Sequence, residues 1–188
     1  MRINTDRLVG LTAMFVAVAS LVALVYQTHL MRQAQYASVL PYLTFVVVSN
    51  NELGSSLTLR NTGIGPALIE DVRIRYKGEE IETDPIDFYV ASHDGASAFG
   101  LNTDKVQRGR LIPAGEWVGM PGARGPADAP QAFGVELLKL FEVAEVPRAW
   151  YAAAKAEGGD KAVVEIIYAS VYGDRWRVRS DRLVPEEL

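Results

Sequence analysis

An uncharged stretch near the N-terminus constrains this chain more than any other feature. From Leu8 to Met31, 24 consecutive residues include no Asp, Glu, Lys or Arg, and the part up to Tyr26 is almost entirely apolar. A helix needs about 20 such residues to cross hydrocarbon about 30 Å thick, and a single segment can satisfy its own backbone there only as a helix. The sequence therefore predicts a transmembrane helix over residues 8–27.

A cleaved signal peptide and the buried helix of a soluble protein are the two alternatives. Arg2 and Arg7 would supply the basic start of a signal peptide. However, its apolar core spans about 7–15 residues, and no pair of small residues marks a cleavage site directly after this longer run. A buried helix is usually shorter and carries a polar stripe, whereas only Gly10, Thr12 and Ser20 interrupt this one. The length favours an uncleaved signal anchor.

Basic residues near the two ends of the span predict its orientation. Arg2, Arg7 and the amino group precede the span, whereas Arg32 is the one basic residue between the span and Arg60. Because Lys and Arg accumulate on the cytoplasmic side, residues 1–7 are expected inside and the C-terminal part outside.

Small residues recur along one side of the predicted span. Gly10, Ala13, Ala17 and Ser20 are spaced by three, four and three residues, which places them on one helical face. Such a face lets two helix backbones approach closely in lipid. The alternative is that Ala and Gly are simply common in membrane spans. Self-association of this helix, giving a homo-oligomer, is therefore one hypothesis.

The rest of the chain is expected to form one domain after a short stalk. Helical spacing of small and apolar residues continues through Ala37, and Pro41 disfavours helical geometry at the residue before it. We therefore expect a juxtamembrane helical stalk over 28–40 and a domain over 41–188. The 150 residues after position 38 are enough for one core.

The charge and cysteine content of this domain exclude several function classes. After residue 38 there are 16 basic and 22 acidic residues, a formal net charge of −6. A net negative surface repels phosphate backbones, so no nucleic acid partner is expected. The chain has no cysteine, which removes disulfides, thiol catalysis and thiolate metal sites.

Short alternating patterns bounded by turn residues predict a mainly β domain. They indicate a hairpin over 42–48 and 55–60, a strand over 72–77, a strand–turn–strand unit over 110–118 and a last hairpin over 162–172 and 175–182. Residues 79–104 are acidic and expected to be irregular, and 119–130 are expected to form a loop. Helical patterns cover 135–142 and 148–157.

Two turn motifs carry a resemblance to a known group of domains. The first is Asn61-Thr62-Gly63-Ile64-Gly65-Pro66-Ala67, and the second is Leu111-Ile112-Pro113-Ala114-Gly115-Glu116. Their order resembles the immunoglobulin-like β-sandwich of bacterial exported proteins, of the cell-adhesion-related bacterial type, and is similar to that of uncharacterised bacterial single-pass membrane proteins. The expected fold is an immunoglobulin-like antiparallel β-sandwich with one or two short helices inserted.

The resemblance also implies a location and a role. A bacterial single-pass protein with an inside N-terminus would lie in the inner (cytoplasmic) membrane and display its domain in the periplasm or elsewhere outside the cytoplasm. The turn motifs serve sandwich geometry, so the resemblance implies a scaffold or interaction module and carries over no active-site residue.

Catalytic and metal-binding signals are sparse in the domain. His93 is its single histidine, and the sequence neighbours Ser92 and Asp94 would point away from it on a loop. A group of acids could offer oxygen ligands but lacks the spacing of a calcium loop: Glu79, Glu80, Glu82, Asp84 and Asp87. We therefore predict no catalytic, cofactor-binding or metal-binding residue.

A basic sheet face is the most suggestive surface feature. Alternation places these arginines on one side of their strands: Arg73, Arg75, Arg175, Arg177 and Arg179. Together they could meet an acidic partner protein or anionic headgroups. The alternative is an ordinary solvent-facing side that cross-strand acids such as Glu165 neutralise.

Three functions remain open at this point. The first is a non-enzymatic, membrane-anchored interaction or scaffold module that binds other membrane or envelope proteins. The second is a membrane-tethered hydrolase that uses carboxylates of the 79–104 region. The third is an accessory subunit that joins a larger membrane complex through its helix.

Overall fold

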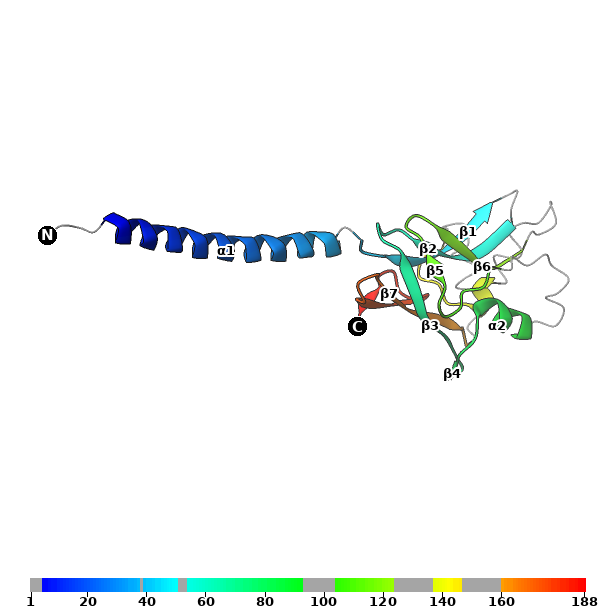
Figure 1. Cartoon of the computed structure of the whole chain (residues 1–188). Helices are drawn as coiled ribbons and strands as arrows, with labels where there is room; N and C mark the ends of the chain where they lie inside the picture. The colour runs from blue at the N-terminus through cyan, green and yellow to red at the C-terminus, as the bar shows by residue number, and fades with distance from the viewer. Residues whose placement is uncertain (1–4, 38, 51–53, 93–103, 124–136, 147–159) are drawn as a thin grey trace. The chain divides into compact units, whose positions relative to one another are not determined.

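The chain forms a long N-terminal helix and a β-rich domain. The computed structural model describes residues 5–37, 39–50, 54–92, 104–123, 137–146 and 160–188. The chain divides into two compact units, Met1–Ser38 and Val39–Leu188. Figure 1 shows the elements of both units along the chain.

The N-terminal helix confirms the helical segment that the sequence predicts. Helix α1 spans Thr5–Ala37, and its Leu8–Arg32 part is long and apolar enough to cross a membrane. None of the apolar window is buried within the protein. The hydroxyls of Thr12 and Thr28 donate to backbone carbonyls four residues earlier, at 2.6 and 2.8 Å. These two polar groups are thus satisfied inside the helix, as an apolar environment requires.

Two antiparallel sheets build the domain, which confirms the predicted mainly β class. The first sheet has the order β1-β2-β6, with β1 at Leu43–Asn50, β2 at Gly54–Asn61 and β6 at Trp117–Ala123. The second has the order β4-β3-β7-β8-β9, with β5 paired to β3. Its strands are β3 (Ala67–Tyr76), β4 (Glu79–Ile81), β5 (Leu111–Ile112), β7 (Val163–Ala169), β8 (Arg175–Arg179) and β9 (Glu186–Glu187).

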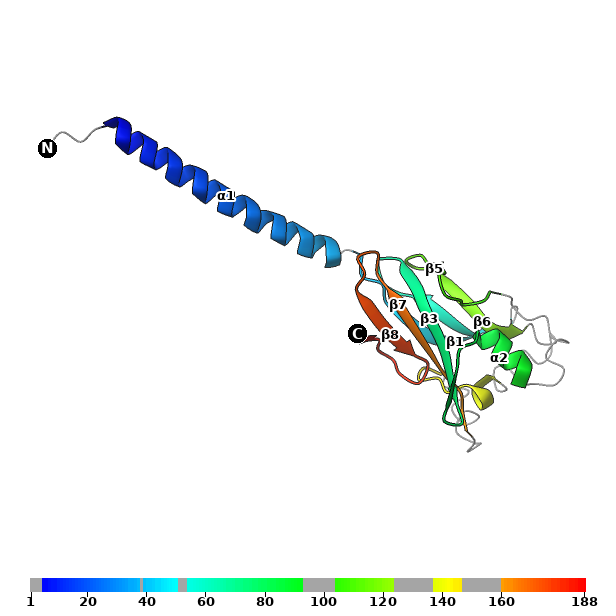
Figure 2. The same cartoon turned by 60° about the horizontal axis from the view of Figure 1, so that its bottom comes forward.

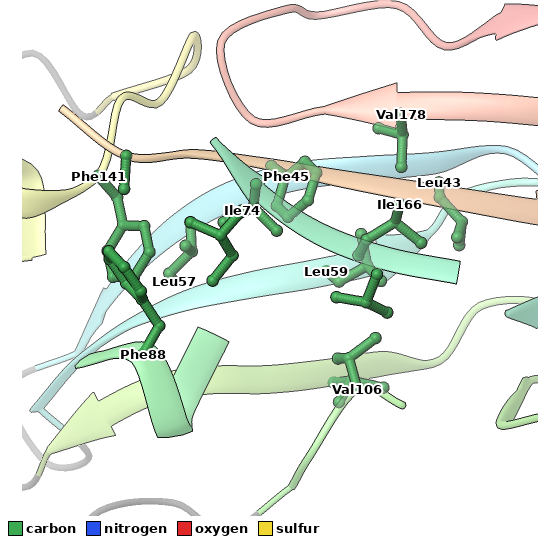
Figure 3. Packing of buried hydrophobic residues seen from close by; sticks show 14 of the residues in the cluster. Leu43, Phe45, Leu57, Leu59, Ile74, Phe88, Val106, Phe141, Ile166 and Val178 are labelled. Atoms are coloured by element: carbon green, nitrogen blue, oxygen red, sulfur yellow. The ribbon is translucent and has the colours of Figure 1, made fainter. Parts of the chain in front are cut away.

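The core is filled from both sheets because their strands alternate apolar and polar residues. Leu59 of the first sheet and Ile74 and Ile166 of the second are all fully buried in one apolar cluster. Figure 3 shows these side chains pointing into the space between the ribbons, with Phe88 and Phe141 closing one end. The opposite face of the second sheet carries mainly polar residues.

The acidic segment after β3 is more regular than the sequence predicts. Strand β4 and helix α2 (Pro85–Ser92) lie in the stretch expected to be irregular. Asp84 stabilises the start of the helix, because its carboxylate accepts from the N–H of Ile86 at 2.8 Å and from that of Val106 at 2.6 Å. The first bond caps the helix and Pro85 suits its first turn. The expectation of an irregular region is therefore wrong over these residues.

Two further expectations change in the second half of the domain. Strand β6 continues through Ala123, so the loop predicted over 119–130 is wrong for its first five residues, of which Gly119, Gly122 and Ala123 pair with β2. Residues 137–140 are helical, within the predicted helix over 135–142. The helix predicted over 148–157 lies outside the described residues.

Asn61 joins the two turn motifs at the point where the domain begins. Its side-chain oxygen accepts from the N–H groups of Tyr42 and Gly63, at 3.2 and 3.0 Å. Its amide nitrogen lies 2.8, 3.1 and 3.2 Å from the carbonyl oxygens of Gly65, Ile112 and Pro113. The residue is fully buried, so one amide holds the start of β1, the 61–66 bend and the turn after β5 together.

The same bend makes backbone contacts with residues 39–42, which follow α1. The carbonyl of Leu40 accepts from the N–H of Ile64 at 3.0 Å and from that of Gly65 at 3.3 Å. A methyl group at Gly65 would overlap the backbone of Val39, and one at Gly63 would overlap that of Leu40. Glycine is required here because the two backbones touch. Helix α1 ends at Ala37, before the predicted stop at Pro41, and residues 39–42 belong to this backbone contact.

Tyr168 of β7 ties the second sheet to the start of the first. Its hydroxyl accepts from the N–H of Leu43 at 3.3 Å, and its ring stacks on Trp176 with centroids 5.7 Å apart. Burial raises the pKa of Tyr168 to about 12, an effect that the hydrogen bond from Leu43 partly opposes.

This pKa predicts an alkaline loss of stability. Because the folded state favours the neutral phenol, its contribution is complete below pH 10 and is lost as the pH rises through about 12. A shift of this size corresponds to about 2–3 kcal/mol. We expect chemical denaturation at pH 9 and pH 12 to show this loss, and Tyr168→Phe to reduce it. An equal loss in both proteins would contradict the assignment.

Candidate functional site

The five arginines that the sequence singled out lie on one face of the second sheet. Arg73 of β3 and Arg179 of β8 both stand opposite Glu165 of β7 in the strand register. Directly opposed residues share a face, and the neighbours Ile74 and Val178 are buried on the other side. We call this outer surface the arginine face. Its remaining members Arg75, Arg175 and Arg177 follow by the two-residue period of β3 and β8.

Each of these arginines has a carboxylate partner. The ion pairs are Arg73–Asp71 at 2.6 Å, Arg75–Glu80 at 2.8 Å, Arg175–Glu70 at 2.7 Å, Arg177–Glu165 at 3.3 Å and Arg179–Asp181 at 2.7 Å. Arg182 and Glu186 form a further pair. Six arginines thus pair with six acids, so the face is a charge-balanced ladder and not the basic stripe that the arginines alone suggest.

The pairs keep both partners charged. Asp71 raises the pKa of Arg73, chiefly by its charge, and the hydrogen bond to Glu80 raises the pKa of Arg75. The same hydrogen bond lowers the pKa of Glu80. The Nε of Arg177 lies near Glu165 but does not have the geometry of a hydrogen bond. The buried Nε of Arg73 also has no hydrogen-bond acceptor among the described residues. The ladder therefore presents fixed charges of both signs.

An open hollow of about 710 Å³ lies on this face. The hollow lies at a bulge in β3 between Ile69 and Asp71, where the register of β3 with β7 shifts by one residue. The bulge puts two consecutive acids on the outer side of the strand. The charged residues that line the hollow are Glu70, Asp71, Arg73, Glu82, Arg108 and Arg175.

Arg108 differs from the other arginines of the hollow. It is exposed, and no ion pair or hydrogen bond joins its side chain to another described residue. Gly109, which follows it, donates its N–H to the carbonyl of Ile69 at 2.8 Å, so the backbone beside Arg108 is fixed against the bulge. A cation held at the rim of a hollow, with no carboxylate partner among the described residues, is suited to meet an acidic group of another molecule.

Three carboxylates of the 79–104 region make structural contacts, those of Glu80, Asp84 and Asp87. Glu80 pairs with Arg75, and Asp87 pairs with Lys105 at 2.6 Å. Asp84 is buried directly before helix α2, and this burial raises its pKa although hydrogen bonds from three backbone N–H groups oppose the effect. Within the described part of the chain no three His, Cys, Asp or Glu side chains gather as a metal site would need.

The predicted Ser92-His93-Asp94 stretch is described only at its first residue. The Ser92 hydroxyl donates to the carbonyl of Phe88 at 2.7 Å, as a helical serine does at the end of α2. His93 and Asp94 lie outside the described residues. The loop expected for this stretch is wrong at Ser92, which is the last residue of α2, and stays a prediction at the other two residues.

The small-residue face of α1 keeps its predicted spacing along a continuous helix. Gly10, Ala13, Ala17 and Ser20 are all exposed, and a methyl group added at Gly10 would meet no atom within 4 Å. The face is therefore open to another helix, and association through it stays a prediction.

The hollow and Arg108 were not predicted from the sequence, although the spacing of apolar residues in β3 contained one signal for the bulge. Inward positions of β3 run 67, 69, 72, 74 and 76, which skips one residue at the acidic pair Glu70-Asp71. Such a skip indicates a β-bulge. No sequence signal placed Arg108 beside it, since that contact joins residues nearly forty positions apart.

The chain was also compared with known proteins. Searches against family models, curated proteins and solved structures gave no match. The site's function is therefore argued from its own residues.

Proposed function

We propose that this chain is a membrane-anchored interaction module, held in a membrane by α1. The observation that carries this proposal is the exposure of α1. Its 25-residue Leu8–Arg32 segment has a mean hydropathy of 2.6, and none of its apolar window is covered by the rest of the protein. In water this surface would be strongly unfavourable, whereas hydrocarbon accommodates it.

The proposal includes a location and a fold family. Arg2 and Arg7 before the span favour an inside N-terminus and an outside domain, in a bacterial inner membrane. We also propose an immunoglobulin-like β-sandwich of the cell-adhesion-related bacterial type. The joining of the two turn motifs by Asn61 supports it, because both motifs then serve one structural purpose.

The arginine face is the proposed binding surface of the module. Its fixed charges of both signs favour a protein partner with a complementary charge pattern over a uniformly charged polymer. The hollow makes this face concave at one place, where a partner side chain can enter. Arg108 supplies a cation there for a partner carboxylate. Rim charges of this kind guide association and specificity more than they add affinity.

A pull-down of the full chain in mild detergent tests this surface. We expect Arg108→Glu combined with Arg175→Glu to abolish recovery of the partner, because both side chains line the hollow and both substitutions reverse charge. The matched control is Arg60→Glu, since Arg60 is exposed on the first sheet. The double variant should remain folded because Arg175 is about half exposed.

The outcomes separate the remaining candidates. Equal recovery with the double variant and with the control would overturn binding through the arginine face. Loss of the partner on Ala13→Leu with Ala17→Leu, and not on the arginine changes, would identify an accessory subunit that binds through α1. The exposure of this helix face is the observation that keeps that second candidate open.

A further inference from the structure

Exposed apolar side chains of the domain gather at the end where the chain enters from α1. We call this surface the entry end, and its members are Leu40, Ile64, Trp117, Val171, Tyr172 and Leu188. Their exposed fractions run from 44% at Leu40 to 65% at Ile64. Elsewhere on the described domain, large apolar residues of this exposure are fewer, and Val184, between β8 and β9, is one of them at 62%.

The strand register places these residues together. The bend that holds Ile64 leads directly into β3, and Leu68 of β3 stands opposite Ala169, the last residue of β7. The turn with Val171 and Tyr172 follows at once, so both turns lie at the same end of the second sheet. Figure 2 shows the start of β3 beside the turn between β7 and β8.

Two more members come from other strands. Trp117 opens β6 opposite Arg60, next to the last residue of β2. The N–H of Leu188 donates to the carbonyl of Arg175, the first residue of β8, at 3.0 Å. Both sheets therefore contribute to the entry end.

The two entry turns differ in charge from the turn at the other end of β3. The tips of the two entry turns, residues 62–66 and 171–173, contain no charged side chain. At the other end of β3, the turn to β4 carries Lys77 and Glu79. The two entry turns thus present apolar side chains without charge, although Arg60 and Glu116 adjoin Trp117 and Glu187 precedes Leu188. Trp and Tyr at such an end are typical of the membrane–water interface.

The length of α1 limits how far its last residue can lie from the bilayer. Its 33 residues extend about 50 Å, whereas a bilayer with its headgroups is about 40–45 Å thick. Only Ser38 separates Ala37 from Val39, and the bend at Gly65 holds residues 39–40 by backbone contact. The last residue of α1 therefore lies within about 10 Å of the headgroups.

We propose that the entry end is a lipid-contacting surface that inserts its two turns into the interfacial region of the membrane that holds α1. This rests on the proposed anchor. The insertion would fix the tilt of the domain, so that the arginine face is presented at a constant angle to the membrane plane.

Single spin labels on the full chain test this proposal, because the chain has no native cysteine. Ile64→Cys and Val171→Cys report on the entry end, and Val184→Cys, in the segment between β8 and β9, is the control outside the two entry turns, with a similar exposure. Phe15→Cys reports on α1 itself. Each protein is reconstituted in vesicles of phosphatidylcholine and phosphatidylglycerol. The measurement is the ratio of collisions with oxygen, which concentrates in lipid, to collisions with a water-soluble chelate.

We expect a high ratio at residue 15, a raised ratio at 64 and 171, and a low ratio at 184. A high ratio at 15 with equally low ratios at 64, 171 and 184 would overturn the lipid contact and leave the anchor intact. A low ratio at 15 would overturn the anchor and the contact with it. Unchanged melting curves would show that the labels, all at exposed sites, leave the fold intact.

Discussion

Replacing Asn61 with Asp is expected to lower the free energy of unfolding of the domain by about 3–5 kcal/mol. The amide nitrogen lies within 2.8–3.2 Å of three carbonyl oxygens, and a carboxylate oxygen in its place would repel all three from a fully buried position. Thermal unfolding should shift downward by about 10–15 °C for a domain of this size.

Two further variants define the cause. Asn61→Ala removes the charge effect but leaves buried N–H and C=O groups without partners, each of which costs about 1–3 kcal/mol. The control is Thr62→Ala, because Thr62 is exposed and its hydroxyl makes one bond of 3.2 Å to the carbonyl of Tyr42. If Asn61→Asp melts like the control, Asn61 does not hold the two turn motifs together.

Two lysines in the middle of α1 are expected to release the chain from the membrane. Phe15→Lys and Val18→Lys each place a charge near the centre of the apolar segment, at a cost of about 2.5–3.5 kcal/mol per residue. The measurement is the fraction of protein that stays in the membrane pellet after extraction at alkaline pH. We expect most of the double variant in the supernatant.

The matched control adds the same two charges near the end of the segment. Gln27→Lys with Met31→Lys lies where lysine side chains can reach the headgroups, so its insertion cost is small. The control should remain in the pellet. Equal extraction of both variants would show that charge as such, rather than its depth, decides the outcome, and would contradict a spanning helix.

Much of the fold follows from local patterns. The long apolar run gives α1, and two-residue alternation gives the β1–β2 hairpin and the polar outer side of β3. Helix α2 was not predicted although Asp84-Pro85 is a strong start signal, because its eight residues are too few to show a clear helical period. Strand β6 extends past its predicted end because pairing with β2 outweighs the low strand preference of its glycines.

The candidate site could be predicted only in part. Alternation placed Arg73 and Arg177 on outer faces, but it could not show that β7 lies between their strands and puts Glu165 within reach of both Arg75 and Arg177. Charge neutralisation is a property of strand order, which local sequence does not contain. The position of Arg108 beside the bulge is likewise a contact between segments distant in the chain.

The central claim is that α1 spans a membrane and carries the domain outside the cytoplasm. Labelling of single cysteines in intact spheroplasts by a thiol reagent that cannot cross membranes tests it most directly, with the full chain carrying Thr5→Cys or Val184→Cys. We predict that Val184→Cys is labelled in intact spheroplasts and Thr5→Cys only after lysis, with both proteins in the membrane fraction. Labelling of Val184→Cys only after lysis, or recovery of the chain in the soluble fraction, would contradict the account.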